Sequence, residues 1–356
     1  MKRFVLLFVV LVLAQGCTSV RYYSQVTRGH LDLMSRRVPI DDLLADPTVD
    51  AQLKTRLSQV LDARAFAVSE LRLPDNGSYR SYADLERPFV VWNVFATPEF
   101  SVVPTTWCYW FVGCLGYRGY YAEADAERER RRLTEQGYDA FVGGVAAYST
   151  LGRFDDPVLN TMLRRGDTEL AGLLFHELTH QVVYRVGDSE FSESLASFVQ
   201  MEGVRRWLLR TGNTELIDVY RQAEVRNTQF VELVSRTRTV LADIYAREWP
   251  PAQMREAKVR AFESLKNDYR TLKAQWGGYA GYDGWFDRPL NNAHVASVAT
   301  YNRFVPAFAQ VLRESNNDFD AFFRRCAELE KMDAEPLARE LERLMSQAAQ
   351  YEGSAP

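Results

Sequence analysis

The stretch Phe175-His176-Glu177-Leu178-Thr179-His180-Gln181 contains the pattern His-Glu-x-x-His. Residues four apart lie on one face of a helix, so His176 and His180 can direct two imidazoles at a single point. Glu177 lies beside them, where it can act as a general base on a water bound to the same metal ion. The pattern therefore predicts a catalytic zinc site, provided that the stretch is helical.

The flanking residues predict such a helix. Gly166, Asp167 and Thr168 form a start signal, and leucines and valines then recur at helical spacing as far as Gly187, without a proline. The alternative is a helix whose histidines and glutamate bind no metal. That alternative is disfavoured because uncompensated polar groups are costly to bury in so apolar a helix. Two of the 4 histidines of the chain also fall in this motif.

A third ligand should come from the next element, because catalytic zinc takes three protein ligands and keeps a fourth position for water. After a Gly-Asp turn at 187–188, residues from Ser189 onward predict a second helix that carries Glu193. Ala196 and Ser197 share a face with Glu193, and their small size lets this helix press against the first. Glu193 therefore comes within reach of the metal.

The predicted site is a Zn²⁺ ion held by His176, His180 and Glu193. Glu190 is the alternative third ligand. Glu202 is a candidate for a hydrogen bond to one of the metal-binding side chains, without contact to the metal itself. A solvated helix charge is the other interpretation of Glu193, but its small, weakly polar neighbours disfavour it.

The His-Glu-x-x-His pattern with a downstream Ser-Glu-x-x-Ala at 192–196 resembles the gluzincin metallopeptidases, whose third ligand is the Glu of an Asn-Glu-x-x-Ala-type helix. Stretches at 74–79, 143–152, 154–159 and 291–293 resemble a family of predicted bacterial aminopeptidases, many of them lipoproteins. The resemblance covers most of the chain and implies a zinc cofactor and a peptide substrate. Ser192 replaces the usual Asn, and Ser197 stands where thermolysin-like enzymes carry an Asp that supports a ligand His.

Length and composition are those of a globular protein. The 356 residues, 47% hydrophobic and 25% charged, fit one large catalytic domain. The net charge is -4 and no basic cluster occurs, which argues against a nucleic-acid partner. Composition gives no indication of the oligomeric state.

The first residues predict export. A basic region at 1–3 and an apolar run at 4–13, too short to span a bilayer, indicate a signal peptide at 1–16. The residues before Cys17 resemble a bacterial lipobox, with Ala14 where Leu is usual. We therefore expect Cys17 to be lipidated and to anchor the protein to a membrane; a conventionally cleaved, soluble protein is the alternative. Thr18 after the cysteine points, by resemblance to lipoprotein sorting, to the outer membrane, facing the periplasm.

The remaining cysteines fit an oxidising compartment. Cys108 and Cys114 are spaced to close a hairpin with a disulfide, and no second pair is present to complete a zinc site with them. Cys326 is predicted to be a buried, small hydrophobic residue.

The predicted fold is α+β and zincin-like, with one metallopeptidase domain at 17–356. It has a helical lead-in at 17–87, a sheet and the zinc-site helices at 88–210, and a helical part at 211–356. Strand and helix patterns are listed in chain order: helices at 29–36, 50–72 and 122–136, strands at 89–95, 106–111, 117–121 and 140–146, a long α-hairpin at 216–248 and 254–275, and one helix at 291–312. The strands predict a small, mainly antiparallel sheet.

The last strand offers a candidate substrate site. Gly143, Gly144 and Ala146 leave a bare edge, and zincins bind an extended substrate backbone as an added strand. Gly144, Ala146 and Tyr148 are the predicted substrate contacts. The alternative is a strand weakened by glycine that leads into a loop.

Peptide hydrolysis also needs a donor for the developing oxyanion. Tyr301, at i+7 from His294 on the helix expected at 291–312, is the predicted residue. His294 and Tyr148 are alternatives, and simple packing with a satisfied polar tip is the alternative for all three.

These features favour a zinc peptidase, and the resemblance favours an aminopeptidase. The strand at 143–147 lacks the Glu that gluzincin aminopeptidases use near the substrate amine, and Glu190, Glu202 and Asp155 are possible substitutes. A zinc endopeptidase is the first alternative. The second is a non-catalytic, lipid-anchored scaffold or assembly protein of the cell envelope, against which Glu177 and the bare strand edge argue.

Overall fold

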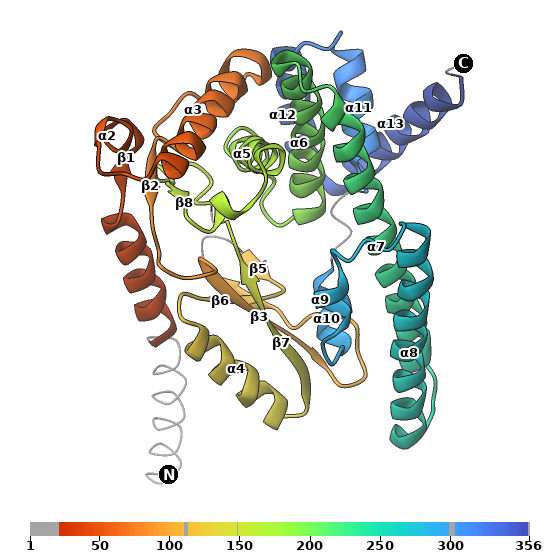
Figure 1. The fold of residues 1–356 in the computed structure, drawn as a ribbon. Helices are drawn as coiled ribbons and strands as arrows, with labels where there is room; N and C mark the ends of the chain where they lie inside the picture. Colours follow the sequence, from red (N-terminus) through yellow and green to blue (C-terminus); the bar gives the residue numbers. More distant parts are fainter. Residues whose placement is uncertain (1–20, 110–112, 148, 299–302, 355–356) are drawn as a thin grey trace, which may run out of the picture.

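Helices make up most of the chain in the computed structural model, which describes residues 21–109, 113–147, 149–298 and 303–354 (Figure 1). The architecture is α+β, as predicted. Two packed regions are visible, a helical region around the His-Glu-x-x-His stretch and a smaller region built on strands (Figure 1).

The central sheet is antiparallel, as predicted. Strand β3 (Val91–Pro98) lies between β6 (Arg118–Tyr120) and β7 (Tyr138–Val145), and the β3–β7 pairing runs from Val91 opposite Val145 to Pro98 opposite Tyr138. Helix α4 (Glu123–Glu135) packs on β3 and β7, and its buried Ala126 and Leu133 share a hydrophobic cluster with Trp92 and Val94. Among the described strands β7 pairs only with β3, so its other edge is not paired in the sheet.

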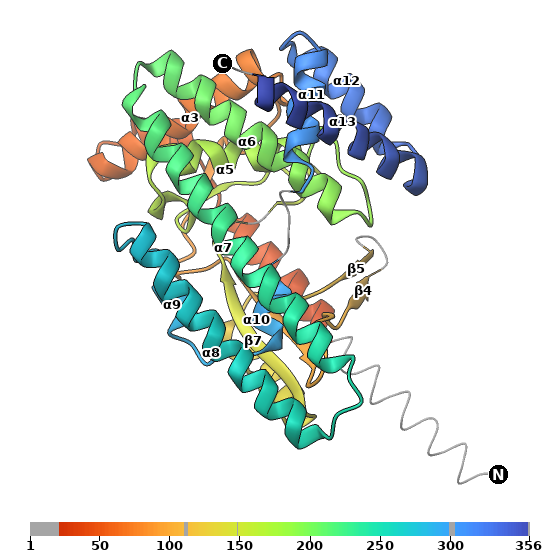
Figure 2. The same cartoon turned by 90° about the vertical axis from the view of Figure 1, so that its right-hand side faces the viewer.

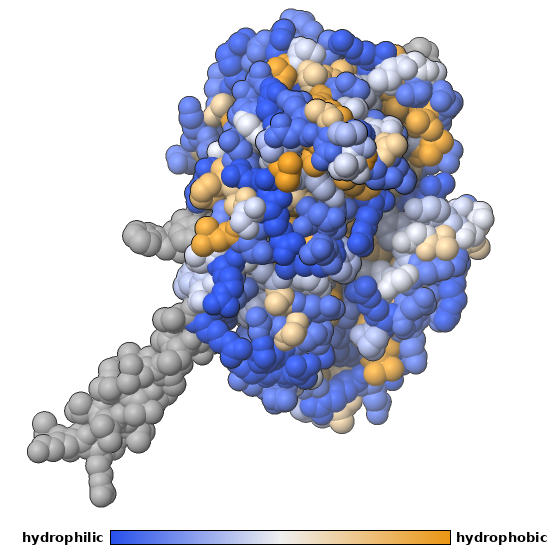
Figure 3. Space-filling model, turned by 60° about the vertical axis from the view of Figure 1, so that its left-hand side comes forward, coloured by the Kyte–Doolittle hydropathy of each residue, from blue (hydrophilic) through white to orange (hydrophobic). Residues whose placement is uncertain are grey.

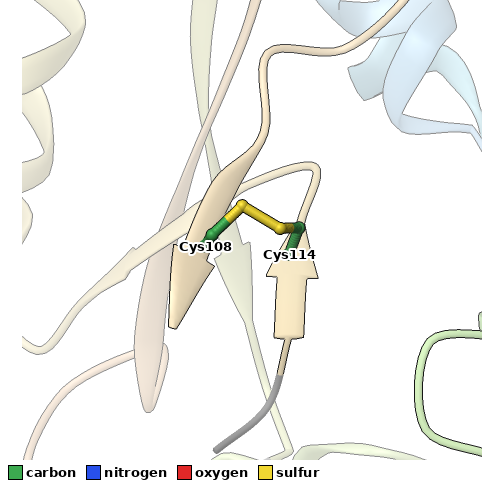
Figure 4. The surroundings of a disulfide bond; sticks show 2 residues. All are labelled: Cys108 and Cys114. Atoms are coloured by element: carbon green, nitrogen blue, oxygen red, sulfur yellow. A yellow bond between two sulfur atoms is a disulfide. The ribbon is translucent and has the colours of Figure 1, made fainter. Parts of the chain in front are cut away.

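The other strands are two or three residues long, too short for an alternating pattern to reveal all of them. Strands β4 (Trp107–Tyr109) and β5 (Gly113–Leu115) form a hairpin that the predicted Cys108–Cys114 disulfide closes (Figure 4). A third sheet joins β1 (Val38–Pro39), β2 (Ser81–Ala83) and β8 (Val158–Leu159), with β2 and β8 parallel. This sheet was not predicted.

The helical region surrounds α5 (Asp167–Thr179), the helix that carries the His-Glu-x-x-His motif and is called the zinc-motif helix. Its members share the largest hydrophobic core and are listed in chain order: α2 (Ile40–Ala45), α3 (Ala51–Leu71), α5 (Asp167–Thr179), α6 (Ser189–Thr211), α11 (Val305–Glu314), α12 (Phe319–Glu330) and α13 (Ala334–Ser354). Asp50 caps the start of α3 and Asp188 the start of α6 through side-chain hydrogen bonds to backbone N–H groups. Cys326 is buried in this core, as predicted.

The long α-hairpin is present as predicted. Helix α7 (Glu215–Tyr245) and helix α8 (Pro251–Gln275) pack antiparallel, and Pro251 stands at the start of α8, where a missing N–H has no consequence. Figure 2 shows α7 running from the helical region down beside β7 and α10 (Asn292–Ser297). Short helix α9 (Asp283–Phe286) and α10 complete a second hydrophobic cluster with the hairpin.

The prediction of one helix at 291–312 is wrong, because the chain forms two helices there. Helix α10 ends where Val298 leaves the helical conformation (ψ 88), and α11 starts only at Val305. Asn291 and His294 form a capping box at the start of α10, so His294 serves a helix end, and its ring stacks on Phe141 with centroids 4.0 Å apart. The lead-in helix is also longer than expected and covers 21–35.

A buried arginine holds the loop at 72–80 behind the zinc-motif helix. Arg64 of α3 is 3% exposed and donates Nε to the Ser78 carbonyl (2.9 Å), Nη1 to the Asp75 carboxylate (3.1 Å) and Nη2 to the Asn76 carbonyl. Asn76 in turn donates Nδ2 to Oε1 of Gln181, directly after the motif (2.7 Å). The loop is therefore tied to both α3 and the site.

The stretches at 74–79 and 154–159 meet behind the same helix. A Cβ on Gly77 would collide with the Asp155 carboxylate, and the N–H of the fully buried Tyr79 donates to the Asp156 carbonyl (2.6 Å). The Asp156 carboxylate accepts hydrogen bonds from the N–H (2.8 Å) and hydroxyl (3.0 Å) of Thr150. Burial raises the pKa of Asp156 to about 6, against the lowering effect of those two bonds.

The surface gives little sign of a broad apolar interface on the face that Figure 3 shows, which is mostly hydrophilic with small separate hydrophobic patches. Among the described residues, no helix combines the length and the apolar character that crossing a bilayer requires.

We expect Arg64→Ala to lower the free energy of unfolding by about 2–4 kcal/mol, because it removes a buried guanidinium and leaves the buried Ser78 carbonyl without its donor. Urea denaturation measures this. Arg260→Ala on α8 is the matched control, since that side chain is exposed and its Glu256 contact is 3.8 Å; it should change stability by less than about 1 kcal/mol. Equal losses in the two variants would contradict the role of Arg64.

Asp156 should make stability depend on pH. Because its folded pKa is raised, the folded protein binds more protons than the unfolded chain between about pH 4 and 6. Its contribution to the free energy of unfolding is fully present below about pH 4 and is lost as the pH rises through 6, by about 3 kcal/mol. Asp156→Asn should therefore gain stability relative to the parent between pH 4 and 7 in urea titrations. The variant Asp155→Asn, at the exposed neighbouring residue, should show no such gain. If the stability difference from the parent is independent of pH for both variants, the prediction is refuted.

Candidate metal centre

The zinc-motif helix α5 ends earlier than predicted, at Thr179 rather than near Gly187. His180 is its last helical position (φ -60, ψ -20), so His176 and His180 still share one helix face. After it, the N–H groups of Gln181 and Val182 bond back to residues three positions earlier, which forms a tight turn. The two Nε2 atoms face each other at 3.2 Å.

Glu193 reaches this pair from α6, the helix packed along α5. Its Oε2 lies 3.2 Å from Nε2 of His176, and its Oε1 lies 3.7 Å from Nε2 of His180. Glycine permits the close approach of the two helices, because a Cβ on Gly172 would lie 3.1 Å from Val204 and one on Gly203 would lie 2.8 Å from Phe175. The sequence predicts this closeness from Ala196 and Ser197, and Gly172 and Gly203 are further small residues at the contact.

The donor set fits zinc. Each of the three residues offers one ligand atom, and these atoms all lie within 4.8 Å of one another. Tetrahedral zinc with bonds near 2.0–2.1 Å places its ligand atoms roughly 3.3 Å apart, close to the 3.2 Å between the two Nε2 atoms and the 3.2 Å between Nε2 of His176 and Oε2 of Glu193. No other group of this kind occurs in the part of the chain that the structure describes.

The charges of the three residues also favour a cation. Burial alone would raise the pKa of Glu193, but hydrogen bonds from His176 and His180 outweigh burial and lower it. Burial would likewise lower the pKa of His176, but the Glu193 carboxylate outweighs it and raises that pKa. The carboxylate thus draws positive charge to this point, and a metal ion would compete there with protons.

The far sides of the imidazoles differ from a typical zinc site. A zinc-bound His usually donates its other N–H to a carboxylate or carbonyl. Here Nδ1 of His176 and Nδ1 of His180 are buried and have no hydrogen-bond partner among the described residues. Gln200 of α6 faces His176 and contributes to its raised pKa, and Ser197 supplies no supporting acid.

Glu177 lines a cavity of about 640 Å³ together with His176. Its charge reaches the groups behind the helix, where it contributes after burial to the raised pKa of Tyr79 and of Asp156. No salt bridge occupies Glu177 in the described part of the chain. Its carboxylate is therefore available to a water or substrate in the cavity.

The alternative acids lie elsewhere. Glu190 pairs with Arg303 at 3.4 Å, and Glu202 pairs with Arg205 and Arg206 at 2.7 Å each. Neither joins the group of possible metal ligands. Both carboxylates are therefore engaged in ion pairs with arginines and not in the candidate metal site.

The predicted substrate strand is less open than expected. A Cβ on Gly144 would collide with the Phe89 ring, so packing requires this glycine. The Ala146 carbonyl accepts a hydrogen bond from the Thr161 hydroxyl at 2.6 Å. Asn291 donates to the Ala140 carbonyl of β7 at 3.2 Å, so the family-like stretch at 291–293 contacts this strand.

Three predicted residues cannot be placed. Tyr148, Tyr301 and Cys17 lie outside the described residues. His294 is placed, but it caps α10 and stacks on Phe141 and therefore has a structural role.

Tyr184 is a site residue that the sequence analysis missed. Its ring packs edge-on against His180 with centroids 5.7 Å apart, and both residues line a second cavity of about 250 Å³. Burial, and then the charge of Glu193, raises the pKa of Tyr184. Its position in the sequence could have indicated this contact, because Tyr184 follows His180 by four residues, as His180 follows His176.

Comparison with known proteins gives one match. A family model described as "Putative aminopeptidase" matches residues 21–341. No curated protein and no solved structure matches the chain. The match includes all three ligand candidates, Glu177 and Tyr184, and it covers about nine-tenths of the sequence. The chain therefore belongs to the Putative aminopeptidase family.

Proposed function

We propose that the protein is a zinc-dependent aminopeptidase with a zincin-like, gluzincin-type site. The observation that carries the proposal is the convergence of His176, His180 and Glu193 at distances that suit zinc, with Glu177 on the adjoining cavity. Membership of an aminopeptidase family supports peptide hydrolysis as the reaction.

The residues divide the chemistry between them. A zinc ion, when bound, supplies a Lewis acid and lowers the pKa of its water to about 7. His176, His180 and Glu193 would hold that ion. Glu177 takes a proton from the attacking water and delivers it to the leaving amine. Its position between the cavity and the groups behind α5 suits this task.

We infer that Tyr184 stabilises the developing oxyanion. It contacts His180 from the side of the smaller cavity, and its hydroxyl keeps its proton because burial and Glu193 raise its pKa. A protonated hydroxyl at this point can donate a hydrogen bond to the developing negative charge. Tyr301, which the sequence favours as the oxyanion donor, lies outside the described residues, and its role stays a prediction.

We also propose that the protein is exported and anchored. The signal peptide at 1–16 would direct export, and after its removal a lipidated Cys17 would hold the protein at the bacterial outer membrane, facing the periplasm. The Cys108–Cys114 disulfide supports an oxidising compartment.

Glu177→Gln should retain zinc but lose hydrolysis by about 1,000-fold or more, because the variant keeps the ligands and lacks the base. His176→Ala should lose both zinc and activity. Metal analysis of the purified variants and hydrolysis of a free peptide measure these effects. Glu190→Gln, outside the site, should change neither. A Glu177→Gln variant as active as the parent would refute the assigned base.

Tyr184→Phe should lower kcat by about 100-fold and leave zinc content and KM close to those of the parent, since only a transition-state donor is removed. The exposed Tyr279→Phe serves as control. If kcat is unchanged in Tyr184→Phe, the oxyanion donor is another residue.

Digestion of a peptide library with and without a chelator separates the alternatives. Stepwise loss of N-terminal residues, abolished by the chelator, is the expected result. Internal cleavage would instead identify an endopeptidase. Intact peptides in the presence of zinc-loaded protein would favour a non-catalytic scaffold of the envelope.

A further inference from the structure

The larger cavity beside the metal centre has an acidic lining. His176 and Glu177 stand at one end, and the start of α5 and the first turns of α7 form its walls. The charged side chains around it are Arg165, Asp167, Glu169, Glu177 and Glu224. Carboxylates thus outnumber the cation by four to one at the place where a substrate must enter.

These acids are not equivalent. Asp167 is already neutralised by Arg56 and accepts a hydrogen bond from Gln59 at 2.7 Å. Glu169 is exposed in the first turn of α5, where its charge complements the helix dipole. Glu224 is partly buried on α7, and no cation pairs with it among the described residues. Burial raises its pKa, against the lowering effect of a hydrogen bond to Tyr220.

A hydrogen-bonded chain fixes the direction of the Glu224 carboxylate. Gln200 faces His176 and donates Nε2 to the Tyr220 hydroxyl oxygen at 3.2 Å. The Tyr220 hydroxyl is then left to donate to Glu224, with which it is hydrogen-bonded. Glu224 is therefore held as an acceptor on the wall of the cavity, with lone pairs left for one more donor.

We propose that Glu224 binds the α-ammonium group of a peptide with a free N-terminus and so restricts the enzyme to terminal residues. This inference rests on the proposed function. An ammonium group offers three donors and a positive charge, which matches a partly buried carboxylate without a cation. The cavity then receives the first residue of the peptide while its carbonyl lies at the metal centre.

The acids considered from sequence for this task do not suit it. Glu190 and Glu202 are occupied by arginines, and the Asp155 carboxylate packs against Gly77 behind α5. None of the three lines the cavity that His176 and Glu177 share. The sequence did not predict Glu224, because it lies 47 residues after Glu177 and the residues around it form no recognisable motif.

The test compares Glu224→Gln with the parent on one peptide in two forms, with a free and with an acetylated N-terminus. For the free form, KM should rise about 10- to 100-fold, because a charge pair is lost. The acetylated form, which has no ammonium group, should be a poor substrate with the same low kcat/KM in both proteins, and zinc content should stay unchanged. Glu224→Asp should retain part of the preference, and Glu232→Gln, exposed on the same helix, should match the parent. Equal losses on both forms, or none on either, would overturn the assignment.

A binding measurement separates this proposal from the proposed function. Calorimetry of leucine amide with the Glu177→Gln variant reports recognition of the amine without hydrolysis. Adding Glu224→Gln should weaken that binding by about 10- to 100-fold, and unchanged binding would overturn the role of Glu224. Failure of the parent to hydrolyse any peptide, with this binding loss intact, would overturn the peptidase proposal alone.

Discussion

The close contact between α5 and α6 is the constraint on which the site depends. Two imidazoles on one helix can meet a carboxylate from another only if the backbones approach closely, and Gly172 and Gly203 leave the required space. The same contact buries Phe175 and much of the main core. Packing and ligand geometry are therefore set by one interface, and a larger side chain at either glycine would disturb both.

A second layer of polar groups lies behind that interface. Arg64, the loop at 72–80 and Asp156 connect α3 and the third sheet to the residues that follow the motif. Arg64, Ser78, Tyr79 and Asp156 are buried, and the hydrogen bonds among them and to Gln181 hold the back of α5. Two of the stretches that resemble the family outside the motif, 74–79 and 154–159, help to build this support, which gives their presence a physical reason.

The sequence predicted the features that repeat over several turns or carry distinctive chemistry. The motif helix, the helix of Glu193, the long hairpin and the disulfide followed from periodicity, caps and cysteine spacing. It failed at 291–312, where Val298 leaves the helical conformation after α10 and a new helix starts only at Val305. Strands β1, β2 and β8 were too short to leave a pattern. Tyr184 and Glu224 depend on contacts across the fold, which no local pattern contains.

Helix α7 has a mechanical consequence. Its 31 residues form one rod of about 46 Å, whose first turns wall the cavity and whose remaining length is clamped to α8 and α10. Rods of this kind transmit tilt with little bending. A small rotation of the far end of the hairpin would therefore move the wall of the cavity, and a contact at that far end would change the width of the cavity beside His176 and Glu177.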